Sequence, residues 1–185
     1  MRRTSLPHFF FVLAALVVLG SDNFGEPLPS KSKSPIKAGV WNVVRVVDGD
    51  TLIVGNKADR FQLYRVRLIG VDTPEVVHPT KPVEPFGPEA SAFTKQKIAE
   101  AGNKVRIAFD GDQLDRYERI LAMVYLKMPD GKEIWLNEVL VREGLATVEL
   151  QYRYSDSAKR ALVAAETEAK NAKRNMWEEK LTVSP

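Results

Sequence analysis

RVRLIGVDTPE, residues 65–75, begins like a half-buried strand and ends in a turn that carries two carboxylates. An arginine in a half-buried strand loses hydration free energy unless an anionic group meets it. Arg67 and Asp72 would point to opposite faces of a regular strand, because the difference between their residue numbers is odd. We therefore predict that the chain bends at Gly70, so that both side chains face one site.

Segments with the patterns of strands surround this stretch. Residues 42–54, NVVRVVDGDTLIV, predict a hairpin, because Asp-Gly lies between two β-branched runs. A strand is expected over residues 61–71, and alternation of apolar residues predicts two more over 104–109 and 120–127. After the last of these, a Pro-Asp-Gly turn leads to a short segment that ends at Trp135.

Three helices are expected between and after the strands. The first begins at residues 87–91, GPEAS, and ends before Gly102, and the second covers residues 136–143. The third begins at Ser155 or Ser157 and has a stripe of apolar residues at helical spacing. That stripe contains Ala158, Leu162, Ala165, Ala169, Ala172 and Met176. The elements together predict an α+β fold, a five-stranded OB-type β-barrel with three helices.

Composition excludes several kinds of chemistry. The 185 residues contain no cysteine, so disulfides, thiolate nucleophiles and cysteine-based zinc sites are excluded. Only two histidines are present, which disfavours a multi-histidine metal site or a histidine-centred triad. The formal net charge of +3 permits a polyanionic partner but does not require one.

The N-terminal residues differ in composition from the rest of the chain. Residues 1–20 combine two arginines with a short apolar run, as expected for a signal peptide, or for an N-terminal anchor if it is not cleaved. Residues 21–39, rich in proline, serine and lysine, are expected to be a flexible linker. A single domain is predicted over residues 40–178, followed by a tail over 179–185. The mature protein is expected to act outside the cytoplasm, in the periplasm or as a secreted protein.

Acidic and basic residues gather in three short motifs, DGDT at 48–51, DTPE at 72–75 and DRYER at 115–119. Each motif alone can be explained locally, as a hairpin turn, a capped turn or an exposed loop with paired charges. Those local explanations do not account for Arg67 in an apolar strand directly before two carboxylates.

A phosphodiesterase site explains the three motifs together. Asp50, Asp72 and the carbonyl of Thr73 are oxygen donors of the kind that hard divalent cations such as Ca²⁺ prefer. Arg67 and Arg119 are suited to bind the non-bridging oxygens of a phosphate, because the planar guanidinium group matches them bidentately.

Glu75 completes this hypothesis as the group that orients or deprotonates a water molecule. Asp48 either stabilises the turn or supports the metal carboxylates from behind.

From about Val43 to Trp177, the chain resembles the staphylococcal nuclease family. The motifs that carry the resemblance are DGDT, RLIGVDTPE, FGPEASAFTK, DRYER and NEVLVREGLA, which occur in the family's order. The resemblance implies an OB-type barrel with three helices and a Ca²⁺-dependent endonuclease that acts on DNA and RNA and leaves 3′-phosphate ends. It also implies catalytic roles for Arg67, Glu75 and Arg119, and metal-binding roles for Asp50, Asp72 and Thr73.

Substrate contacts are expected from residues that the resemblance places near the phosphates and bases. These are Lys81, Arg116, Tyr117 and one tyrosine of the pair Tyr152 and Tyr154, with Tyr152 preferred. Lys81 can equally be a solvated loop lysine, and either tyrosine can be a packed surface residue. His78, in the same loop as Lys81, is expected to be structural.

Glu118 departs from the family motif, which has glycine at this position, and places a carboxylate between Arg116 and Arg119. If Glu118 paired with Arg119, that arginine would be less free to bind phosphate. The alternative to an enzyme is a non-catalytic nucleic-acid- or protein-binding module on the same fold. A monomer is expected, with contact to a membrane only if the N-terminal segment is not cleaved.

Overall fold

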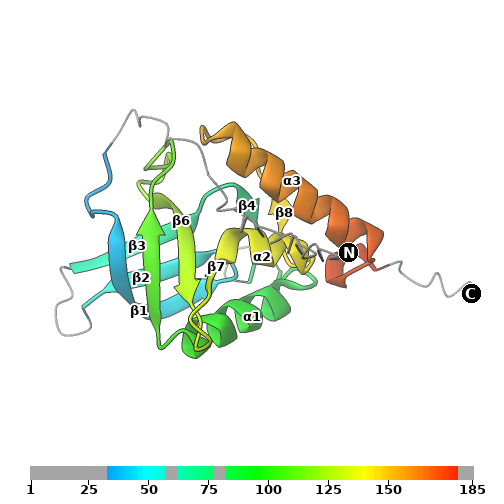
Figure 1. Cartoon of the computed structure of the whole chain (residues 1–185), viewed down its shortest axis with the longest axis horizontal. Helices are drawn as coiled ribbons and strands as arrows, with labels where there is room; N and C mark the ends of the chain where they lie inside the picture. Colours follow the sequence, from blue (N-terminus) through cyan, green and yellow to red (C-terminus); the bar gives the residue numbers. More distant parts are fainter. Residues whose placement is uncertain (1–32, 57–61, 77–81, 179–185) are drawn as a thin grey trace, which may run out of the picture.

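The computed structural model describes residues 33–56, 62–76 and 82–178 of the chain (Figure 1). Its elements follow in the order β1 (Gly39–Asp48), β2 (Thr51–Gly55), β3 (Leu63–Leu68), β4 (Val71–Asp72), α1 (Gly87–Glu100), β5 (Lys104–Ala108), β6 (Ile120–Lys127), β7 (Glu133–Trp135), α2 (Leu136–Arg142), β8 (Thr147–Val148), α3 (Asp156–Asn171) and the 3₁₀ helix η2 (Asn175–Trp177).

Five strands close into a barrel. β3, β2, β1, β5 and β6 pair with one another antiparallel in that order, and a parallel pairing of β3 with β6 closes the ring. β7 extends the sheet beside β6, and β4 pairs separately with β8. The predicted α+β fold with a five-stranded OB-type barrel is confirmed.

The strand register explains both the core and the position of polar groups at one end of the barrel. Val46, Leu52, Val66 and Ile120 lie opposite one another across β1, β2, β3 and β6. Burial of a side chain such as Leu52 or Val66, each fully buried, is worth about 1.5–3 kcal/mol. The neighbouring row places Asp48 opposite Thr51 and Thr51 opposite Arg67. The β1–β2 turn and Arg67 therefore meet at the same end of the barrel.

Gly70 interrupts the strand that was expected over residues 61–71. β3 ends at Leu68, Gly70 adopts φ +80°, and the chain resumes as β4, which pairs with β8 instead of with the barrel. Glycine adopts a positive φ far more readily than other residues do. The predicted bend at Gly70 is confirmed, whereas the prediction of one continuous strand is wrong.

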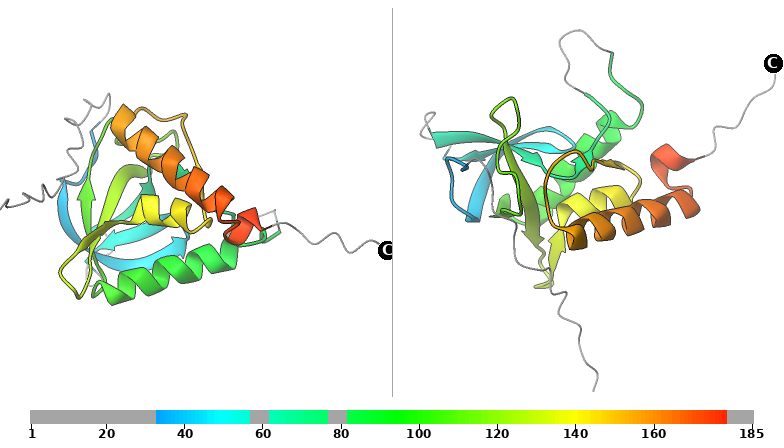
Figure 2. Two further views of the ribbon diagram at one scale, coloured as in Figure 1. Left: turned by 45° about the vertical axis from the view of Figure 1, so that its right-hand side comes forward. Right: turned by 90° about the horizontal axis from the view of Figure 1, so that it is seen from above.

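The helices pack beside the barrel. In Figure 1, α1 runs beneath the strands, and α2 lies between the strands and α3; the views of Figure 2 show the same arrangement. Ser155 caps α3, with its side-chain oxygen accepting a hydrogen bond from the Ala158 N–H. The predicted apolar stripe is buried from Ala158 to Ala169. It ends there, because Ala172 is the exposed C-cap of α3 and Met176 belongs to η2.

The packed domain begins earlier than the predicted boundary at Val40. Ile36, which falls in the predicted linker, is buried in the hydrophobic core. The Ser34 N–H donates to Gln113 Oε1 at 2.8 Å, and β1 begins at Gly39. The predicted signal segment and tail lie outside the described residues. Among the residues that the structure describes, no helix is long and apolar enough to cross a membrane.

Replacing Gly70 by alanine is expected to destabilise the protein for two reasons. The new Cβ would lie 2.8 Å from Leu162 Cδ1 and 2.9 Å from Tyr154 Cζ, and the backbone conformation is left-handed. Gly102→Ala is a matched control, because Gly102 has φ +69° but a Cβ there would meet nothing within 4 Å. Chemical denaturation should show Gly70→Ala to be less stable than the control by about 1–3 kcal/mol, the usual range for overpacking. Equal losses would mean that the turn adjusts without affecting α3.

Candidate functional site

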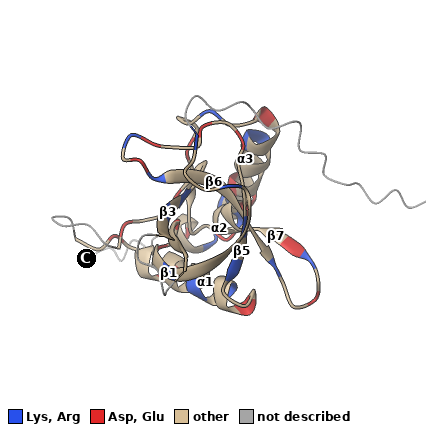
Figure 3. Ribbon diagram, turned by 90° about the vertical axis from the view of Figure 1, so that its left-hand side faces the viewer, with Lys and Arg blue, Asp and Glu red and all other residues tan. Residues whose placement is uncertain are grey.

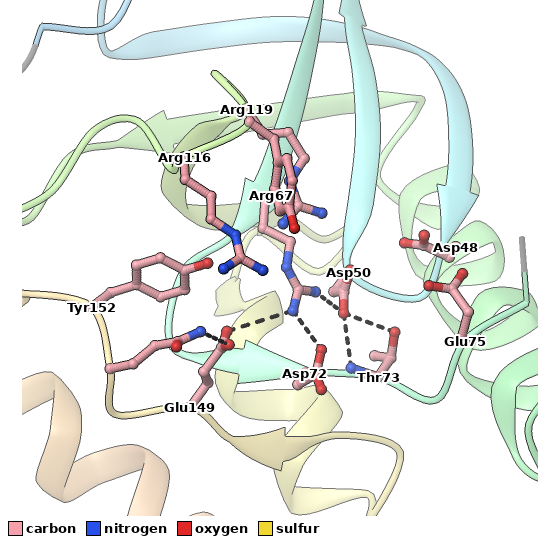
Figure 4. A pocket seen from close by; sticks show the side chains of 12 residues that line it. Asp48, Asp50, Arg67, Asp72, Thr73, Glu75, Arg116, Arg119, Glu149 and Tyr152 are labelled. Carbon is pink, nitrogen blue, oxygen red and sulfur yellow. Dashed lines mark hydrogen bonds and ion pairs between the residues drawn. The ribbon is translucent and has the colours of Figure 1, made fainter. Parts of the chain in front are cut away.

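A pocket of about 390 Å³ lies at the end of the barrel where the β1–β2 turn meets Arg67 (Figure 4). Its walls come from the β1–β2 turn, β3, the segment after Gly70, the loop before β6 and the segment after β8. The lining residues are Asp48, Asp50, Arg67, Asp72, Thr73, Glu75, Arg116, Tyr117, Arg119, Glu149, Gln151 and Tyr152. The pocket thus brings together every predicted catalytic and metal-binding residue.

Arg67 lies at the centre of the pocket and is buried. Its guanidinium group forms an ion pair with Asp50 through Nη1 and with Asp72 through Nη2, the latter at 2.6 Å. A third carboxylate, that of Glu149, lies 3.5 Å from Nη2. Nε is buried and has no hydrogen-bond partner within the described part of the chain. Arg67 therefore keeps one donor uncommitted while its charge is balanced by the carboxylates.

Asp50 joins the β1–β2 turn to the segment after β4. Its Oδ2 accepts hydrogen bonds from the N–H of Thr73 at 2.8 Å and from Thr73 Oγ1 at 2.9 Å. Gly49 lies so close to Thr73 that a Cβ on it would be 2.7 Å from Thr73 Cγ2. The Gly49 carbonyl accepts a hydrogen bond from Thr94 Oγ1 of α1 at 2.6 Å. The DGDT motif therefore docks two other segments in addition to making a hairpin turn.

Asp48 and Glu75 lie on the side of the pocket away from Arg116 (Figure 4). Asp48 is buried, and its Oδ1 makes no hydrogen bond to any described residue. The Glu75 N–H donates to Glu84 Oε2 at 3.1 Å, which fixes the backbone before α1. Glu75 thus lines the pocket, next to a buried oxygen of Asp48 that has no hydrogen-bond partner among the described residues.

The carboxylates fit a hard cation by donor type and by convergence. Asp50 and Asp72 bind the same guanidinium group, so they approach a single positive centre from two directions. Oxygen donors of this kind suit Ca²⁺. Within the described residues there is no cluster of three or more histidine, cysteine, aspartate or glutamate side chains arranged to hold a metal. The donors that converge here are therefore limited to two carboxylates, with the Thr73 backbone nearby.

Arg119 is oriented by Asp115. Asp115 Oδ2 accepts from Arg119 Nε at 2.6 Å, and Oδ1 accepts from the N–H groups of Arg119 and Tyr117. The carboxylate of Asp115 is nearly inaccessible, with 1% of its side chain exposed. Its hydrogen bonds therefore stabilise the loop before β6 from inside. The ion pair of Arg119 is thus with Asp115. Glu118 is exposed, and its backbone adopts φ +59°. This left-handed backbone explains why glycine suits the position.

Arg116 and Tyr117 form the outer wall. The Arg116 guanidinium carbon lies 4.7 Å from the centre of the Tyr117 ring, and that of Arg119 lies 5.5 Å from it. Tyr117 is 63% exposed. An exposed ring beside two arginines can stack on a base while the guanidinium groups meet phosphates. Both residues, which were predicted to contact substrate, line the pocket.

The two candidate tyrosines have different environments. Tyr152 lines the pocket and is half-buried, and burial followed by the charge of Glu149 raises the pKa of its phenol. Tyr154 is buried in the core, and its hydroxyl donates to the Glu149 carbonyl at 2.9 Å. Burial raises the pKa of Tyr154 well above its usual range. Tyr152 is therefore the tyrosine available to a ligand.

Glu149 and Gln151 line the pocket but were not predicted from the sequence. Glu149 is largely buried, and burial raises the pKa of its carboxyl above the ordinary value, although Arg67 lowers it. Gln151 donates a hydrogen bond from Nε2 to Glu149 Oε1. The segment has no recognisable motif, and its position follows from the pairing of β8 with β4. Lys81 and His78 lie outside the described residues.

The lining carries five carboxylates and three arginines, an excess of negative charge. Coulomb repulsion therefore opposes the approach of an anion unless a bound cation offsets this excess. In the view of Figure 3, the basic and acidic residues of the described part of the chain are interspersed along the ribbon, without a broad basic face. Local attraction for an anion therefore has to come from the three arginines of the pocket.

Comparisons with known proteins found a matching family and several similar sequences. Residues 65–179 match the model of a family described as staphylococcal nuclease homologue. The chain is 41% identical over 168 residues to the thermonuclease of Staphylococcus hyicus, covering 90% of this chain and 93% of that protein. It is 35% identical over 178 residues to the thermonuclease of Staphylococcus intermedius, covering 96% and 99%. It is 38% identical over 136 residues to endonuclease YncB of Bacillus subtilis (strain 168), covering 72% and 59%.

Replacing Glu118 by glycine is expected to stabilise the protein. A left-handed conformation costs a non-glycine residue about 1–2 kcal/mol, whereas the extra conformational entropy that glycine loses on folding costs about 0.5–1 kcal/mol. Chemical denaturation should therefore show that the free energy of unfolding rises by about 0.5–1 kcal/mol. Glu89→Gly, in the first turn of α1, is the matched control and should lose about 1 kcal/mol. A loss at both positions would mean that the Glu118 side chain makes a compensating contribution.

Proposed function

The chain belongs to the staphylococcal nuclease family, and we propose that it is a secreted endonuclease that uses Ca²⁺ to hydrolyse phosphodiester bonds of DNA and RNA, leaving 3′-phosphate ends. The observation that carries this proposal is the pocket in which Arg67 and Arg119 face the carboxylates of Asp50 and Asp72. Two planar donors for phosphate and two convergent donors for a cation are the parts that phosphodiester hydrolysis requires.

Asp50, Asp72 and the carbonyl of Thr73 would hold the cation. When bound, Ca²⁺ supplies positive charge that offsets the excess of pocket carboxylates and polarises a phosphate oxygen. Arg119, oriented by Asp115, would bind a non-bridging oxygen of the phosphate. Arg67 would be the second planar donor to the same phosphate, and its buried Nε–H is the donor that no described residue accepts from.

Glu75 would position the attacking water and accept its proton. It lies on the pocket wall next to Asp48, on the side away from Arg116. Arg116 and Tyr117 would hold the neighbouring nucleotides, and Tyr152, which lies beside Arg116 in Figure 4, would contact a base or sugar. Lys81 is proposed as a further phosphate contact from its loop.

A non-catalytic binding module on the same fold is the alternative function. Such a module gains nothing from five carboxylates in the pocket, because they repel a polyanion. Secretion is supported by the apolar N-terminal segment that follows two arginines, and membrane association would require that this segment is retained. We propose that the protein acts as a monomer.

Cleavage is expected to require a hard divalent cation. Full-length protein should degrade single-stranded and duplex DNA and RNA with Ca²⁺, and all activity should cease in excess chelator. Asp72→Asn is the matched control for contaminating nucleases, because it removes one carboxylate charge from the pocket at a side chain that is 61% exposed. Cleavage that persists in chelator, or in this variant at the wild-type rate, would exclude the proposed mechanism.

Arg67→Lys is expected to bind nucleic acid but to cleave it slowly. Lysine retains the charge that attracts the polyanion but loses the planar fork. Loss of one positioned donor typically lowers the rate by about 10²–10³-fold. Single-turnover cleavage and affinity under non-cleaving conditions separate the two effects. Arg106→Lys, which changes an arginine paired with Glu133 outside the pocket, is the control and should leave both unchanged. Equal losses of affinity and rate would make Arg67 a binding residue alone.

A further inference from the structure

Arg67 shares its charge among three carboxylates, and two of them belong to the proposed cation site. Nη2 lies 2.6 Å from Asp72 Oδ1 and 3.5 Å from Glu149 Oε2. The shorter distance is a hydrogen bond, and the longer one is an ion pair without a hydrogen bond. Glu149 Oε2 therefore lies beside Nη2 as a second acceptor that makes no hydrogen bond to it.

The structure holds Glu149 firmly in this position. Its N–H donates to the Gly70 carbonyl at 2.9 Å, and its own carbonyl accepts from the Tyr154 hydroxyl at 2.9 Å. The Gln151 side chain binds Oε1 and leaves Oε2 toward Arg67 (Figure 4). Oε2 is itself buried and accepts no hydrogen bond within the described ranges. An unsatisfied buried carboxylate oxygen is costly, so its retention beside Arg67 calls for a partner in some state of the protein.

A divalent cation on Asp50 and Asp72 would change the surroundings of Arg67. The two carboxylates that bind the guanidinium group would be shared with a second positive centre, which repels it. Arg67 would then be displaced from the pocket unless another anion bound Nη2. Glu149 is the remaining carboxylate with an ion pair to Arg67 in the part of the chain that the structure describes.

We propose that Glu149 is a positioning residue that takes over Nη2 of Arg67 when a divalent cation occupies Asp50 and Asp72. It keeps the guanidinium group against the scissile phosphate, with Nε still available, and lowers the repulsion between the guanidinium group and the cation. This inference rests on the proposed function, because it assumes both a cation at these carboxylates and phosphate at Arg67.

The opposite role would be that of a competitor. If Glu149 occupied the place of the phosphate on Arg67, removing its charge would strengthen anion binding and accelerate cleavage. The uncommitted Nε and the 3.5 Å separation from Nη2 argue against this, because a competitor would bind the donors that phosphate uses. The two roles thus predict changes of opposite sign.

Glu149→Gln in the full-length protein distinguishes them, because it removes the charge and nearly preserves the shape. Calorimetric titration with CaCl₂, without nucleic acid, should show affinity reduced by roughly tenfold, within the range of coupling between linked sites. In steady-state cleavage, kcat should fall by a similar factor, roughly tenfold, while KM changes little, as for an interaction made in the transition state. Glu149→Asp should recover part of both losses.

Two further variants separate this role from a general effect of charge or folding. Glu133→Gln removes a carboxylate from the Arg106 ion pair outside the pocket and should change neither Ca²⁺ affinity nor kcat. Gln151→Ala keeps every charge but frees the Glu149 side chain, so it should lower kcat in the same direction by a smaller factor.

The outcomes separate this inference from the proposed function. Wild-type protein that neither binds Ca²⁺ nor cleaves would overturn both. Wild-type protein that does both, with a Glu149→Gln variant equal to it or faster, would overturn the role of Glu149 and leave the nuclease proposal intact. Weaker Ca²⁺ binding together with lower kcat and unchanged KM supports the role.

Discussion

The buried guanidinium group of Arg67 is the interaction on which the rest of the site depends. Its three carboxylate partners come from the β1–β2 turn, from β4 and from the segment after β8. A buried ion pair such as that of Arg67 with Asp50 contributes little net stability, but removing Arg67 would leave the buried Asp50 charge uncompensated, which costs about 3–5 kcal/mol. The cluster therefore serves less to stabilise the barrel than to require that three separate segments meet at one place.

Gly70 makes that meeting geometrically possible. In a regular strand Arg67 and Asp72 would point to opposite faces, but the turn at Gly70 brings both side chains to the same pocket. Gly70 itself packs against Tyr154 and Leu162 of the C-terminal part of the chain. Asn137 of α2 secures the same turn from the other side, donating to the Ile69 carbonyl at 2.8 Å and accepting from the Val124 N–H at 2.9 Å. Helices that do not reach the pocket thus determine its geometry through the backbone of this turn.

Much of this architecture could be predicted from local sequence. The barrel strands, the bend at Gly70 and the pocket positions of Arg67 and Arg119 follow from periodicity, from glycine chemistry and from motifs that match the staphylococcal nuclease family. Two features could not be predicted in this way. Glu149 enters the pocket through the pairing of β8 with β4, and Ile36 joins the core from a stretch whose composition resembles a linker. Both depend on contacts between distant segments, which leave no local pattern.

The charge of the pocket differs in sign from that of the chain. The formal net charge is +3, yet the pocket lining has five carboxylates against three arginines. Attraction of a polyanion over long distances follows the field of the whole protein, whereas binding at the reacting phosphate follows the local charge. With the carboxylates uncompensated, the pocket disfavours phosphate even though the arginines are already in place. A cation bound by Asp50 and Asp72 would therefore do more than polarise the substrate, since it would convert an acidic pocket into one that a phosphodiester can enter.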